Sequence, residues 1–135
     1  MHFITWKESF SVGVPSIDDQ HKKLVGMINR LYSEFSNGIT NKFLEEIIQE
    51  LQGYTEYHFS YEEKFMQLYH FDDYKEHKAE HNLFIDKINQ YKETLAKENK
   101  KEVIDFITFL KNWLLKHIMG TDKKYMKLFQ DKGMH

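Results

Sequence analysis

Residues 74–95 read YKEHKAEHNLFIDKINQYKETL, and this stretch decides the fold. Its apolar and histidine side chains recur every three or four residues: Tyr74, His77, His81, Phe84, Ile88, Tyr91 and Leu95. This spacing matches the 3.6-residue turn of an α-helix and places these side chains on one face. The pattern therefore predicts a long amphipathic helix over about residues 73–96, with two histidines on its buried face.

Three other segments repeat the pattern, over about residues 17–37, 41–69 and 100–118. Their inward stripes are Ile17, His21, Leu24, Ile28, Leu31 and Phe35; Leu44, Ile47, Leu51, Tyr54, His58 and Phe65; and Val103, Phe106, Leu110, Trp113 and His117. Spacings that alternate between three and four are typical of the seam of a left-handed helical bundle. Because only a few residues join the segments, consecutive helices must run antiparallel. We expect an all-α protein, an up-down-up-down antiparallel four-helix bundle.

The two ends of the chain complete this bundle as one domain over residues 1–135. Residues 1–15 carry several apolar side chains and predict an ordered N-terminal arm. Residues 122–130 have apolar side chains at helical spacing and predict a short C-terminal helix. Ser16 followed by Asp19 has the spacing of a capping pair, which predicts the start of the first long helix.

Composition excludes several classes of protein. The chain has 135 residues, 19 Lys and Arg against 21 Asp and Glu, and no cysteine. A net charge of −2 argues against nucleic-acid binding, and the lack of cysteine excludes disulfides, thiolate zinc sites and iron–sulfur clusters. The N-terminus lacks the features of a signal peptide, and no apolar run is long enough to span a bilayer. We expect a cytoplasmic monomer with no membrane insertion.

Five of the eight histidines interrupt the inward stripes, and each predicted helix contributes at least one: His21, His58, His77, His81 and His117. A single histidine on such a face is commonly an ordinary core residue. Five buried imidazoles without partners, however, would cost several kcal/mol. Since antiparallel helices bring all five toward one end of the bundle, a shared metal site is the simplest explanation.

Two carboxylates complete the predicted ligand set. Glu62 follows His58 by four residues and so shares its face, although it could instead be a surface residue beside Glu63. Asp122 follows His117 by five residues, about 140° away on a regular helix. Gly120 lies between them and permits irregular backbone, which we expect between Ile118 and Thr121.

Seven ligands are too many for one tetrahedral zinc ion, so we expect two ions bridged by Glu62 and Asp122. Mixed nitrogen and oxygen donors favour iron or manganese over calcium or magnesium. Chemistry alone leaves the choice between iron and manganese open.

These residues, taken in order, resemble the bacterial hemerythrins over essentially the whole chain. The matching elements are Trp6, Gly13-Val14, residues 17–21 (IDDQH), 58–63 (HFSYEE), 77–81 (HKAEH) and 113–122 (WLLKHIMGTD). The resemblance implies two iron ions joined by an oxo or hydroxo bridge. One would be held by His77, His81 and His117, and the other by His21 and His58, with Glu62 and Asp122 bridging both. It also implies an oxygen pocket lined by Leu24, Phe59, Trp113, Leu114 and Ile118.

The function that this resemblance implies is reversible dioxygen binding, for storage, transport or delivery, without enzymatic activity. Two alternatives stay open: a module for sensing oxygen or nitric oxide or for handling iron, and a di-iron oxidase or peroxidase. Oxidases of the ferritin-like kind use four glutamates and paired Glu-x-x-His motifs, which this chain lacks at the seam. The sequence names no protein acceptor of oxygen and no electron donor.

Overall fold

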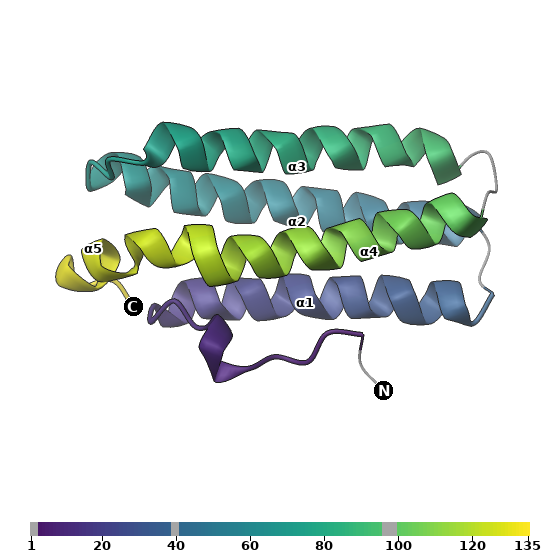
Figure 1. The fold of residues 1–135 in the computed structure, drawn as a ribbon, viewed down its shortest axis with the longest axis horizontal. Helices are drawn as coiled ribbons and strands as arrows, with labels where there is room; N and C mark the ends of the chain where they lie inside the picture. The colour runs from purple at the N-terminus through teal and green to yellow at the C-terminus, as the bar shows by residue number, and fades with distance from the viewer. Residues whose placement is uncertain (1–2, 39–40, 96–99) are drawn as a thin grey trace.

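The computed structural model describes residues 3–38, 41–95 and 100–135. Four long helices form it: α1 (Pro15–Ser36), α2 (Asn41–Leu68), α3 (Tyr74–Leu95) and α4 (Lys100–Lys116). They lie side by side in alternating directions, and each packs against the two next to it around the bundle (Figure 1). The predicted all-α, antiparallel four-helix bundle is therefore confirmed. Among the described residues, each helix is too short or too polar to cross a bilayer.

The first helix begins one residue earlier than the predicted cap. Pro15 occupies the first turn of α1, and Val14 precedes it with extended backbone and no side-chain capping bond. Proline suits this position because its missing N–H would lack a helical partner anyway. The predicted capping role of Ser16 is therefore wrong. Its hydroxyl accepts a hydrogen bond from the hydroxyl of Tyr61 on α2 instead, at 3.0 Å.

The N-terminal arm is held on the bundle at two points. The backbone N–H of Ile4 donates to the side chain of Asn29 on α1 at 2.7 Å, and the Asn29 amide donates back to the Ile4 carbonyl at 2.8 Å. Further along, a short 3₁₀ turn, η1 (Glu8–Phe10), buries Phe10. Gly13 then adopts a positive φ of 72°, and its carbonyl accepts from Gln130 near the C-terminus. The arm thus joins the first helix to the end of the chain.

Regular helical geometry stops at the histidine of the fourth segment. After α4, a π-helical turn, η2 (His117–Thr121), is followed by a 3₁₀ turn, η3 (Asp122–Tyr125), and by the short helix α5 (Met126–Asp131). The backbone N–H of Asp122 donates to the carbonyl of His117, five residues earlier. This widened turn confirms the irregular backbone expected between Ile118 and Thr121. It brings Asp122 onto the face that His117 occupies, which a regular helix could not do.

Two apolar clusters fill the interior. The larger one runs along the bundle and includes Leu24, Phe59, Ile88 and Ile118. The smaller one closes the end where α5 lies, and its buried members are Val12, Val14, Ile17, Met66, Tyr125 and Phe129. Along α1, α2 and the α4–η3 segment, a histidine or carboxylate separates a residue of one cluster from a residue of the other. A layer of buried polar side chains therefore divides the two clusters.

Truncation of the main core provides a test of this packing. Ile88 on α3 is fully buried in the larger cluster, whereas Leu83 on the same helix is 51% exposed. We expect Ile88→Ala to lower the free energy of unfolding by about 2–5 kcal/mol, because it leaves a cavity that neighbours fill only in part. Leu83→Ala should change it by about 0.5 kcal/mol or less. Urea unfolding followed by circular dichroism measures both, and equal losses would contradict the assignment of this core.

Candidate metal centre

The structure brings all seven predicted ligands together in the polar layer. They come from every long segment: His21 from α1, His58 and Glu62 from α2, His77 and His81 from α3, and His117 and Asp122 from η2 and η3. Each of these side chains is between 0% and 3% exposed. Glu62 is thus a buried residue, and the alternative of a surface position for it is excluded.

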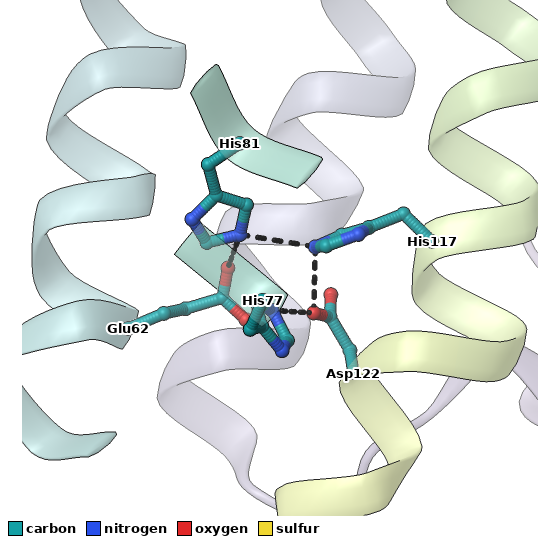
Figure 2. Close-up of side chains that lie close together, drawn as sticks. All are labelled: Glu62, His77, His81, His117 and Asp122. Atoms are coloured by element: carbon teal, nitrogen blue, oxygen red, sulfur yellow. Dashed lines mark hydrogen bonds and ion pairs between the residues drawn. The ribbon is translucent and has the colours of Figure 1, made fainter. Parts of the chain in front are cut away.

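The first group of donors contains three imidazoles and both carboxylates (Figure 2). The Nε2 atoms of His77 and His117 each lie 2.8 Å from Oδ1 of Asp122. Nε2 of His81 lies 3.1 Å from Nε2 of His117 and 3.6 Å from Oε1 of Glu62. Five donor atoms therefore face a common point, all within 4.8 Å of one another.

The second group contains two imidazoles and shares the same two carboxylates. Nε2 of His21 lies 3.0 Å from Oδ2 of Asp122, and Nε2 of His58 lies 2.9 Å from Oε1 of Glu62. Asp122 thus directs one oxygen to each group. Glu62 places Oε1 near a histidine of each group, while its Oε2 accepts a hydrogen bond from the buried hydroxyl of Tyr125. The second group has four donors, one fewer than the first.

The histidines determine the charge of the buried carboxylates. Burial and the charge of Asp122 would raise the pKa of Glu62, but the charges of His58 and His81 and a hydrogen bond to His58 lower it to about 2. Burial would likewise raise the pKa of Asp122, and His117, His21 and His77 together hold it well below its usual value. Both carboxylates are therefore anionic at neutral pH and ready to bind a cation.

The donor set fits a pair of cations. Within the described residues, several buried donor atoms have no hydrogen-bond partner outside the cluster itself: both ring nitrogens of His21 and His77, Nε2 of His58, Oε1 of Glu62 and both oxygens of Asp122. Buried polar atoms are nearly always satisfied, so this concentration of unsatisfied atoms indicates a missing partner. Five imidazole nitrogens with two shared carboxylates suit two metal ions of borderline character.

Three of the five imidazoles are also held by hydrogen bonds at Nδ1, the ring nitrogen that faces away from the centre of the site. Nδ1 of His58 lies 2.7 Å from the amide oxygen of Gln20, Nδ1 of His81 lies 2.9 Å from Glu63, and Nδ1 of His117 lies 3.2 Å from Glu80. The sequence pattern does not predict these supporting residues. Gln20 and Glu63 each sit beside a ligand in sequence, but adjacency on a helix does not reveal which histidine across the bundle they meet.

The expected pocket residues lie on the side of the layer that faces the larger cluster. Phe59 stacks on the ring of His81 with centroids 3.7 Å apart, and Trp113 stacks on His117 at 4.5 Å. Leu24, Leu114 and Ile118 are buried members of that cluster. The inner edge of the site is therefore apolar and aromatic.

Fold and site together define a class: helical-bundle proteins with a buried histidine–carboxylate centre. Residues 12–129 match the family described as "Hemerythrin HHE cation binding domain". The chain is 30% identical to the bacteriohemerythrin of Clostridium acetobutylicum, over 90% of this chain and 97% of that protein. It is 32% identical to the bacteriohemerythrin of Pseudomonas aeruginosa, over 93% and 81%. The chain belongs to the hemerythrin family.

Solved structures agree with this assignment. The crystal structure of wild-type hemerythrin superposes with a TM-score of 0.83 at 28% identity, covering 93% of this chain and 97% of that one. A hemerythrin mutant structure gives a TM-score of 0.85 at the same identity, covering 95% and 98%. The resemblance drawn from the sequence motifs is confirmed over nearly the full length of both chains.

Proton release on metal binding tests the donor set. Without a metal ion, burial would lower the pKa of His117, but the charge and hydrogen bonds of Asp122, with a hydrogen bond to Glu80, raise it to about 10. His117 therefore carries a proton at pH 7 that a metal ion must displace. We expect Zn²⁺, a redox-inert probe, to release at least one proton per chain. Metal affinity should then fall about tenfold for each proton displaced when the pH is lowered by one unit.

The measurement is a weakly buffered titration with a pH indicator in metal-depleted protein. His117→Ala is the matched control and should release about one proton fewer than the unaltered chain. Zinc binding without proton release in the unaltered chain would contradict His117 as a ligand.

Proposed function

We propose that this protein binds dioxygen reversibly at a non-haem di-iron centre, for oxygen storage, transport or delivery. The observation that carries the proposal is the unequal division of donors, five in one group and four in the other, around two shared carboxylates. A metal pair bound there would have its open position on the ion with fewer protein donors. Membership in the hemerythrin family supports iron as the metal.

Each ligand has a proposed role that follows from its place in the two groups. His77, His81 and His117 would hold one ion, and His21 and His58 would hold the other. Glu62 and Asp122 would be shared by the two ions, because both carboxylates belong to both groups. When bound, the iron pair supplies redox-active metal at which dioxygen is held and released.

The apolar edge of the site favours reversibility. Leu24, Phe59, Trp113, Leu114 and Ile118 are proposed to line the oxygen pocket, because the larger apolar cluster borders the ligands there. Apolar walls exclude water and so reduce the competing oxidation of reduced iron. A small uncharged gas can enter such a pocket without the cost of desolvating charge.

The ligand composition favours binding over catalysis. Ferritin-like oxidation sites use mostly carboxylates, whereas this site offers two carboxylates and five imidazoles, which bind metal as neutral ligands. Fewer anionic donors stabilise high-valent iron less, which favours oxygen binding over an enzymatic role. Sensing would use the same site and would require a partner protein that distinguishes the oxygen-bound form from the oxygen-free form.

Reversible oxygenation is tested by visible spectroscopy. We expect protein loaded with iron(II) under anaerobic conditions to gain a visible absorption band on exposure to air, to lose it when oxygen is removed, and to regain it on re-exposure. Repeated cycling measures reversibility. Permanent loss of the band after one exposure, or sustained oxygen consumption with a reductant, would support an oxidase and overturn the proposal.

Removal of one ligand tests the di-iron assignment separately. His77→Ala takes one donor from the three-histidine group, so bound iron should fall well below two ions per chain because an incomplete ligand set holds its ion weakly. His135→Ala removes an exposed histidine at the C-terminus and should leave iron content unchanged. Metal analysis of both variants gives the answer, and two irons per chain in His77→Ala would contradict the assignment.

A further inference from the structure

The hydrogen bonds behind the imidazoles differ in charge between the two donor groups. In the three-histidine group, Nδ1 of His81 faces the carboxylate of Glu63 and Nδ1 of His117 faces that of Glu80. In the two-histidine group, Nδ1 of His58 faces the neutral amide oxygen of Gln20. Within the described part of the chain, Nδ1 of His21 makes no hydrogen bond. The imidazoles of the three-histidine group therefore have two anionic hydrogen-bond partners, and those of the two-histidine group have none among the described residues.

The proton on each of these bonds is assigned by the ring's orientation. Nε2 of His58, His81 and His117 points toward the carboxylates at the centre of the site, so its lone pair is the one available to a metal ion. Nδ1 then carries the hydrogen and donates it outward. An imidazole that donates to a carboxylate gains electron density and becomes a stronger donor than one that donates to an amide.

The two anionic partners are placed differently with respect to water. The side chain of Glu63 is only 18% exposed, and its second oxygen lies 3.9 Å from Nζ of Lys78. The side chain of Glu80 is 44% exposed, in a surface hollow of about 150 Å³ whose lining includes Leu83, Trp113 and Thr121. A glutamate side chain this accessible to water is ionised at neutral pH. Solvent screens its charge more than that of Glu63.

We propose that Glu63 and Glu80 are positioning residues that make the two iron ions electronically unequal. By polarising His81 and His117, they favour the oxidised state of the ion in the three-histidine group, while Gln20 leaves the ion in the two-histidine group easier to keep reduced. The proposal rests on the di-iron centre proposed above. Because Glu63 is more buried than Glu80, we expect it to contribute more to the stabilisation of the oxidised ion.

Potentiometric titration of iron-loaded protein tests this, with Mössbauer spectra along the titration to follow the two ions separately. Glu63→Gln and Glu80→Gln keep the shape of the side chain and remove its charge. We expect Glu63→Gln to lower the ferric-to-ferrous ratio of the ion in the three-histidine group about tenfold at a fixed potential. This change is equivalent to about 59 mV for one electron. Glu80→Gln should act on the same ion in the same direction and by less.

Two further variants make the result specific. Glu76→Gln removes an equal charge from an exposed position one turn before Glu80 on α3, and it should leave both ratios unchanged. Gln20→Glu adds a carboxylate behind His58 and should raise the ferric-to-ferrous ratio of the other ion. Gln20→Glu keeps an acceptor oxygen opposite Nδ1 of His58, so it decides between the outcomes if Glu63→Gln no longer retains iron.

The outcomes separate this inference from the proposed function. A wild-type chain that does not take up two iron ions overturns the proposed function and this inference with it. An intact iron pair whose ratios change no more in Glu63→Gln and Glu80→Gln than in Glu76→Gln overturns this inference alone. Equal changes at both ions would also overturn it, because they would indicate a general charge effect.

Discussion

The contact between five imidazoles and two fully buried carboxylates is the interaction on which the rest of the structure depends. An unpaired carboxylate in an apolar core would cost several kcal/mol or take up a proton. Glu62 and Asp122 avoid both because histidines from all four segments surround them. Each helix must therefore present its histidine at the same height, so this one requirement determines the relative positions of the helices along the bundle.

The remainder of the fold isolates this polar layer. On one side, the larger apolar cluster fills the long part of the bundle; on the other, the smaller cluster closes the end. Tyr125 links the smaller cluster to the polar layer, because its ring stacks on Phe129 and its hydroxyl donates a hydrogen bond to Glu62. Val12 and Val14 at the end of the arm and Phe129 of α5 belong to this smaller cluster. The arm itself runs along α1 toward this end of the bundle, where α5 lies (Figure 1).

The site is asymmetric at two distances from its centre. Among the donors themselves, one group has five members and the other four. Around them, carboxylates back two imidazoles of the first group, and an amide backs one of the second. Both differences act in the same direction. In the proposed di-iron centre, the ion in the larger donor group would also have the more electron-rich ligands, which would leave the other ion as the place for an exchangeable ligand.

The sequence by itself determined the bundle and predicted the seven side chains that cluster inside it, because helical periodicity and residue spacing are local properties. The stripe from Tyr74 to Tyr91 specified one helix face, and the five-residue gap between His117 and Asp122 required the π-turn that the structure contains. Local rules failed where two signals competed, as at Ser16, where Pro15 begins the helix instead. Only the tertiary structure decided which of the glutamates faces which imidazole. Glu63 and Glu80 reach histidines on other helices, and no spacing along one helix specifies the rotation of its neighbour.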